Sequence, residues 1–230
     1  MTSKIKKVIP VMFQIISKIK KVIPVIFQPR ILIQLVSMYR IGYLSEIGWI
    51  DSFKKKMPVD DNSNPLPWVT YSFIDFISDR LNKNMDIFEY GSGNSTLWYA
   101  IRVNSIISVE HDRAWFDKIK KNMPKNSNIY YQELEYGGLY SQFSSQLDRK
   151  FSMVIVDGRD RVCCIKNAIN SIKDDGVIVL DDSEREAYDD AVSFLLSNNF
   201  KKIDFWGISP GLFYKKNTTI FYKEKNCLDI

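Results

Sequence analysis

Acidic side chains end four of the short apolar runs in this sequence, where they could bind a cation or accept hydrogen bonds. The five acids are Glu89, Glu110, Asp157, Asp181 and Asp182. A purely structural role does not call for an acid at all four places. Carboxylates that gather on one rim repel each other unless a cation or hydrogen-bond donors lie beside them. The pattern therefore predicts that these acids meet at a binding site.

The first acid leads into a glycine-containing turn, the stretch EYGSGNST at 89–96. Gly91 and Gly93 permit tight backbone turns and the close approach of a ligand. Ser95 or Thr96 can cap the helix that follows. A strand, a turn of small residues and a helix in this order are suited to gripping a nucleotide.

The residues around this turn restrict the kind of nucleotide. Glu110 lies nineteen residues after Gly91, close to the spacing at which an acid accepts both hydroxyls of a ribose. The turn lacks the third glycine that lets a dinucleotide's pyrophosphate approach the helix N-terminus. A carboxylate at Glu89 would also repel a diphosphate and would suit an ammonium group. These residues predict a nucleoside ligand with a positive charge and no phosphates.

The elements that must position these residues alternate regularly along the chain. Apolar runs predict strands at 86–90, 105–112, 128–134, 151–160 and 176–184, and helical patterns occur at 68–81, 114–122, 161–172 and 186–197. Two closing strands, at 200–208 and 218–224, have no helix between them. Nearly continuous Val and Ile runs between helices are typical of a parallel sheet covered on both faces. We therefore predict an α/β fold: a doubly wound, Rossmann-like, mostly parallel seven-stranded sheet with an antiparallel closing strand.

The N-terminal segment differs from the rest in charge and pattern. Residues 1–56 carry eleven Lys and Arg against two acids, a net charge of +9, so the rest of the chain carries −4 of the total of +5. This acidic body argues against a nucleic-acid partner. Residues 3–14 recur almost unchanged at 17–28, a tandem 14-residue repeat. We assign 1–59 to a basic, apolar appendage and 60–230 to the α/β domain.

Two interpretations of the appendage remain open. A basic, apolar segment could lie on an anionic membrane surface, so residues 1–56 could make a peripheral membrane contact. Alternatively, the repeat is a slipped duplication in a loosely held tail. The three cysteines suit no disulfide framework, and no secretory signal is recognisable, so we expect a cytoplasmic protein.

The motifs resemble those of a known family. EYGSGNST, followed by SVEHD nineteen residues later, resembles motifs I and II of the class I S-adenosylmethionine-dependent methyltransferases, over roughly residues 65–223. The resemblance implies S-adenosylmethionine as cofactor, its methionine end held by Glu89, Gly91 and Gly93 and its ribose by Glu110. The residues expected at the cofactor are Glu89, Gly91, Ser92, Gly93, Asn94, Ser95, Glu110, His111 and Asp157. We favour an adenine-side or structural role for His111 over that of a general base.

A second resemblance concerns the reaction. VDGRDR at 156–161 and LDDSER at 180–185 resemble metal-dependent O-methyltransferases of the macrocin type, which methylate sugar hydroxyls. It implies that Asp157, Asp181 and Asp182 hold Mg²⁺ or Mn²⁺, with Asp157 and Asp181 catalytic. Such a cation would lower the pKa of the acceptor hydroxyl. In the alternative, Arg159 pairs with Asp182 and replaces the metal.

These patterns favour an enzyme that methylates the hydroxyl of a small molecule or a saccharide. Two alternatives remain. The chain could be another transferase on the same fold, such as an aminopropyltransferase that binds a polyamine through the rim acids. It could also be a non-catalytic descendant that docks to a membrane or a partner through residues 1–56.

Overall fold

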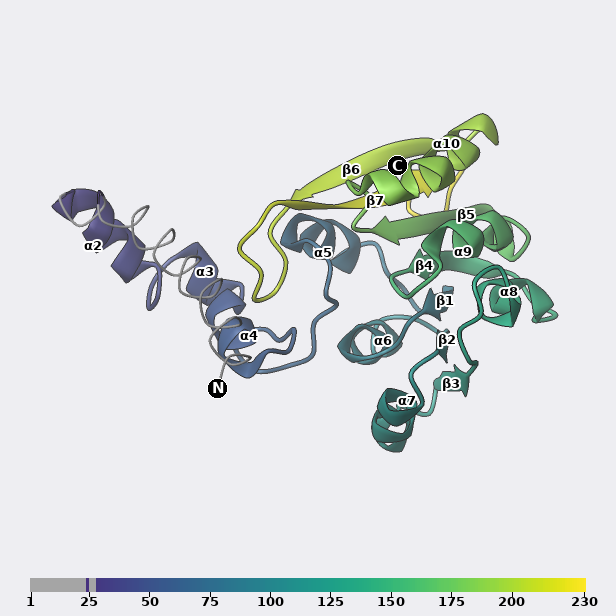
Figure 1. Ribbon diagram of the computed structural model, residues 1–230, viewed down its shortest axis with the longest axis horizontal. Coiled ribbons are helices and arrows are strands. Elements are labelled where there is room, and N and C mark those ends of the chain that lie inside the picture. The colour runs from purple at the N-terminus through teal and green to yellow at the C-terminus, as the bar shows by residue number, and fades with distance from the viewer. Residues whose placement is uncertain (1–23, 25–27) are drawn as a thin grey trace, which may run out of the picture.

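The computed structural model describes residue 24 and residues 28–230. The tandem repeat therefore lies almost entirely outside the described residues. Figure 1 shows a layered α/β body, from which the helix α2 (Pro29–Ser37) extends away.

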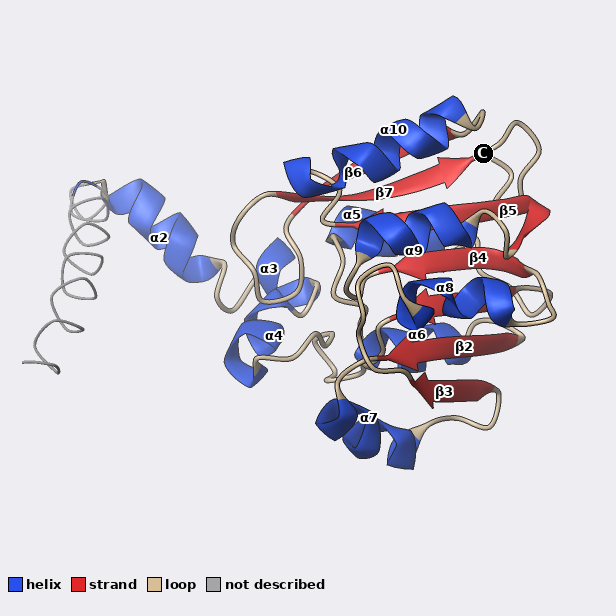
Figure 2. Cartoon of the chain, turned by 45° about the vertical axis from the view of Figure 1, so that its right-hand side comes forward, coloured by secondary structure: helices blue, strands red, loops and turns tan. Residues whose placement is uncertain are grey.

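A seven-stranded sheet forms the centre of the described chain (Figure 2). Its strands are β1 (Asp86–Tyr90), β2 (Ser105–Glu110), β3 (Ser127–Tyr131), β4 (Phe151–Val156), β5 (Ile172–Asp181), β6 (Lys201–Gly207) and β7 (Lys216–Tyr222). Their order is β3-β2-β1-β4-β5-β7-β6, with β1 to β5 parallel and β7 antiparallel to both of its neighbours. The predicted fold class is confirmed.

Helices cover both faces of this sheet. They are α5 (Tyr71–Ser78), α6 (Asn94–Ala100), α7 (Arg113–Ile119), α8 (Leu139–Gln146), α9 (Arg161–Ala168) and α10 (Asp189–Ser197), with 3-10 turns η1 (Lys120–Asn122) and η2 (Glu186–Tyr188). The sequence pattern did not predict α8, because its residues LYSQFSSQ include too many polar side chains to form a recognisable apolar stripe.

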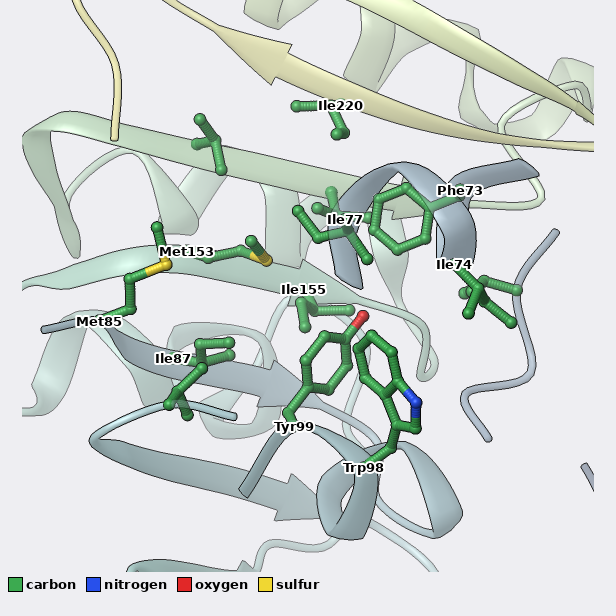
Figure 3. Packing of buried hydrophobic residues seen from close by; sticks show 14 of the residues in the cluster. Phe73, Ile74, Ile77, Met85, Ile87, Trp98, Tyr99, Met153, Ile155 and Ile220 are labelled. Carbon is green, nitrogen blue, oxygen red and sulfur yellow. The ribbon is translucent and has the colours of Figure 1, made fainter. Parts of the chain in front are cut away.

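Two hydrophobic cores hold these layers together. On one face, α5 and α6 pack against alternate residues of the strands, among them Ile155 beside Tyr99 and Trp98 (Figure 3). On the other face, α8, α9 and α10 pack against the intervening residues, among them Val154 and Val156. Because both faces are buried, the strands read as continuous apolar runs rather than alternating ones.

The N-terminal segment forms α2 (Pro29–Ser37), α3 (Tyr43–Glu46) and α4 (Trp49–Lys55). No residue of α2 is buried, whereas α4 contacts the loop between β6 and β7. Trp49 Nε1 donates to the Leu212 carbonyl at 2.7 Å, and Asn94 Nδ2 of α6 donates to the Pro58 carbonyl at 2.7 Å. No helix in the described part of the chain could span a membrane. Residues 49–59 thus contact the α/β domain directly.

Candidate active site

A pocket of about 490 Å³ lies at the carboxyl ends of β1, β2, β4 and β5. The strand order reverses between β1 and β4, and open α/β sheets bind ligands at such a reversal. The pocket is lined by all the predicted site residues, namely Glu89, Gly91, Ser92, Gly93, Asn94, Ser95, Glu110, His111, Asp157, Asp181 and Asp182. The structure therefore brings together every residue that was predicted at the cofactor or at the metal.

The glycine turn after β1 forms one wall of the pocket. Gly91 has φ of 94°, a left-handed conformation that glycine adopts without steric cost, and its N–H donates to the Val109 carbonyl at 2.9 Å. The Trp115 indole donates to the Ser92 carbonyl at 2.9 Å and lies beside Gly93. The turn is thus fixed from both sides, and both of its glycines line the pocket.

Glu89 lies beneath this turn, and its side chain is almost completely buried. Its carboxylate accepts hydrogen bonds from the hydroxyls of Ser95, of Thr96 at 2.5 Å and of Ser108 at 2.9 Å. Burial raises the pKa of Glu89 to about 7, although the three hydroxyls act in the opposite direction. The charge of Glu89 therefore changes near neutral pH, and a positive ligand group beside it would favour the ionised form.

Glu110 ends β2, and hydrogen bonds from the backbone orient its carboxylate. Oε1 accepts from the N–H groups of His111 at 2.8 Å and Asp112 at 2.9 Å, and Oε2 accepts from the Ser92 hydroxyl at 2.8 Å. A carboxylate has about four acceptor positions, so Glu110 keeps capacity for a ligand donor. His111 Nδ1 lies 3.0 Å from Glu110 Oε1, and its ring meets Tyr140 edge to face.

Lys216, at the start of β7, lies between Asp181, the last residue of β5, and Asp182, which follows it. Its Nζ is 2.7 Å from Asp181 Oδ2 and 2.6 Å from Asp182 Oδ1, and the side chain is almost fully buried. Thr218 donates to Asp181 Oδ1 at 2.8 Å. Burial lowers the pKa of Lys216, but the two acids outweigh it and the pKa is raised. Lys216 therefore stays charged at any ordinary pH.

Arg161, the first residue of α9, also contacts these acids. With Lys216, Asp157, Asp181 and Asp182 it forms what we call the charge cluster. Its Nη2 lies 3.0 Å from Asp157 Oδ1, and its Nη1 lies 3.4 Å from Asp182 Oδ2 and also donates to the Asp181 carbonyl. Arg185 Nη2 adds a contact of 2.6 Å to Asp182 Oδ2. Burial, and then the charge of Asp181, raises the pKa of Asp157 well above its usual range. Asp157 is the most exposed of the three acids, at 23%.

The prediction of Mg²⁺ or Mn²⁺ on Asp157, Asp181 and Asp182 is not supported. Among the described residues, no group of three or more His, Cys, Asp and Glu side chains could hold a metal ion. Lys216 and Arg161 take the positions in which a cation would neutralise these acids. The alternative with Arg159 paired to Asp182 is also corrected, because the pairing arginines are Arg161 and Arg185.

Part of the pocket comes from segments in which the sequence analysis placed no site residue. Lys56, Met57 and Pro58 reach it from the end of α4, and Leu212, Tyr214 and Lys216 reach it from the β6–β7 loop and β7. One signal was available for Lys216. A strand that runs antiparallel to the others begins at the sheet edge where the parallel strands have their carboxyl ends.

No protein-family model matches the sequence, and no curated protein matches it. Solved structures do match. A provisionally assigned O-methyltransferase from Klebsiella pneumoniae is 12% identical, with a TM-score of 0.55 over 83% of this chain and 94% of that one. A methyltransferase-like protein from Silicibacter pomeroyi is 22% identical, with a TM-score of 0.50 over 70% and 89% of the two chains. A precorrin-6y C5,15-methyltransferase from Geobacter metallireducens is 17% identical, with a TM-score of 0.50 over 66% and 87%.

At these identities the likeness concerns the fold. The arrangement of strands and helices is that of the class I S-adenosylmethionine-dependent methyltransferases.

Proposed function

We propose that this chain is an S-adenosylmethionine-dependent methyltransferase that methylates a hydroxyl of a small molecule or a saccharide. The observation that carries the proposal is the pairing of the glycine turn after β1 with Glu110 at the end of β2, in one pocket. S-adenosylmethionine fits these residues, since it is a nucleoside with a positive sulfonium and no phosphates.

Each end of the cofactor has residues suited to it. Glu110 accepts from the ribose hydroxyls, with Oε1 held by two backbone N–H groups. The turn at Gly91 and Gly93, which lines the pocket, receives the methionine end, and the buried carboxylate of Glu89 attracts its ammonium group. The bound cofactor supplies an electrophilic methyl group on sulfur.

Asp157 is the base in this proposal. Its Oδ1 accepts from Arg161, and no side chain of the described chain donates to its Oδ2, so that oxygen can accept the proton of the acceptor hydroxyl. A raised pKa strengthens a carboxylate as a base. Asp181 has Lys216 on one oxygen and Thr218 on the other, so we assign it a positioning role.

Aminopropyl transfer is less well supported. A polyamine acceptor needs free carboxylates, whereas Asp157, Asp181 and Asp182 each have a cationic partner on the chain.

Two measurements test the proposal. S-adenosylhomocysteine should bind the purified chain, and Glu110→Gln should weaken that binding by about 1.5–3 kcal/mol, the range of a hydrogen bond to a charged group. The matched control is Glu133→Gln, an exposed acid outside the pocket. Calorimetry that detects no binding by the wild type would refute the cofactor. With binding shown, the product mass distinguishes methyl from aminopropyl transfer, and absence of transfer to any acceptor tested would favour a non-catalytic descendant.

We also propose that the appendage rests on an anionic membrane surface, with the enzyme on the cytoplasmic side. Large apolar side chains of α2 are exposed, namely Ile31, Ile33, Leu35 and Val36. The surplus of Lys and Arg in residues 1–56 complements anionic lipids. Vesicles with a phosphatidylserine fraction should sediment the full chain, and deletion of residues 1–37 should abolish this. Equal sedimentation of both forms, or none, would refute the contact.

A further inference from the structure

Some of the charged side chains that line the pocket have an ion-pair or hydrogen-bond partner on the chain, and others have none. All five acids of the pocket have hydrogen-bond donors or cations of the chain against them, as described above. Arg161, Lys216 and Arg185 are paired with those acids. Lys56 and Arg159 also line the pocket, but among the described residues the side chain of neither makes a hydrogen bond or an ion pair. Lys56 and Arg159 are therefore two pocket cations without an ion-pair partner, whereas Glu89 and Glu110 are held by hydrogen-bond donors rather than by Lys or Arg.

These two cations come from different parts of the fold. Arg159 follows β4 and lies two residues after Asp157, the proposed base. Lys56 follows α4, with a left-handed φ of 52°, a conformation that costs a lysine more than a glycine. In this conformation Lys56 is the C-cap of α4, a common way for a helix to end.

Two half-exposed aromatic rings also line the pocket. Trp68 is 43% exposed, and its Nε1 donates to the Pro210 carbonyl at 2.9 Å, which fixes the plane of the indole. Tyr214, in the β6–β7 loop, is 48% exposed. An oriented indole and a phenol ring in a pocket are suited to packing against a ring of a ligand.

We infer that the methyl acceptor is an anionic, ring-containing molecule. Its phosphate or carboxylate group binds Lys56 and Arg159, and its ring packs against Trp68 and Tyr214. This inference rests on the proposed methyltransferase function and specifies the substrate class of the same pocket. The carboxylate of S-adenosylmethionine supplies one anionic group for these two cations, and an anionic group on the acceptor would supply a second.

The test is calorimetric titration of the chain saturated with S-adenosylhomocysteine. Three probes share one ring and differ in charge: phenyl phosphate, benzoate and phenol. We expect phenyl phosphate or benzoate to bind at least about tenfold more tightly than phenol, as charge-assisted hydrogen bonds imply. The stronger of the two anions identifies the acceptor's group. The double variant Lys56→Gln/Arg159→Gln should lose this preference, whereas Lys54→Gln/Arg113→Gln, which changes two cations outside the pocket, should keep it.

Three results would overturn the inference. Phenol could bind as tightly as both anions, or neither anion could bind, or the double variant could bind the anions as well as the wild type does. Loss of S-adenosylhomocysteine affinity in the double variant would assign the cations to the cofactor instead. If the wild type binds no S-adenosylhomocysteine, the proposed function fails, and the same titration of the cofactor-free chain still decides whether the anion subsite exists.

Discussion

Replacement of Lys216 by methionine tests the charge cluster most directly. Methionine keeps an unbranched, flexible side chain but removes the cation that lies 2.7 Å from Asp181 and 2.6 Å from Asp182. Breaking a buried ion pair ordinarily costs about 3–5 kcal/mol, because one charge stays buried without its partner. Asp182 keeps Arg161 and Arg185, and Asp181 keeps Thr218. We therefore expect the free energy of unfolding to fall by about 3–4 kcal/mol at pH 7.5.

The pH dependence of this loss provides a second measure. In the wild type, burial by itself raises the pKa of Asp182. The groups around it outweigh burial and lower the pKa, and Lys216 is the foremost of them. A lowered pKa contributes stability that is present above the unfolded-state pKa and is lost as the pH falls through the folded-state pKa. Without Lys216, Asp181 and Asp182 take up protons at higher pH. The deficit of Lys216→Met should therefore shrink between pH 7.5 and pH 5.

Urea denaturation with linear extrapolation measures both effects. The matched control is Lys215→Met, which removes an exposed neighbouring lysine lying 4.2 Å from the Trp206 ring centroid and should cost less than about 1 kcal/mol. A second variant, Lys216→Met/Asp181→Asn, should recover part of the loss because it removes one uncompensated charge. A loss below about 1 kcal/mol for Lys216→Met, or a deficit that grows as the pH falls, would refute the buried pairing.

Three further outcomes are expected. Asp157→Asn should lower turnover by about 10²- to 10⁴-fold, the usual range for a general base, while the Kd for S-adenosylhomocysteine changes little; full turnover in the variant would contradict the assignment. Excess chelator should leave turnover unchanged, because Lys216 and Arg161 already neutralise the rim acids; activity that is lost in chelator and restored by Mg²⁺ would reinstate the metal. Because the pKa of Glu89 is about 7, S-adenosylhomocysteine affinity should rise between pH 6 and pH 8 as this acid ionises, and Glu89→Gln should remove that dependence; an identical pH profile in the variant would contradict the ammonium contact.

The sequence alone determined the sheet and the rim of acids. Residues 151–156 and 177–180 are apolar at nearly every position because each strand is buried there on both faces. Once the strands are parallel, their carboxyl ends meet at one edge, so Glu89, Glu110 and Asp157 had to lie near one another. Local pattern and a general packing rule were sufficient for this part.

Only the tertiary structure decided what neutralises the acids and what closes the pocket. Lys216 reaches Asp181 from 35 residues away because β7 pairs antiparallel with β5 in a register that sets Asp181 opposite Thr218. Trp49 reaches Leu212 from 163 residues away, which fixes the β6–β7 loop beside the start of α4. Before that register was known, the sequence favoured a metal ion on these acids over an arginine. The choice among partners depends on which distant side chain arrives within 3 Å, and no local pattern of residues encodes that distance.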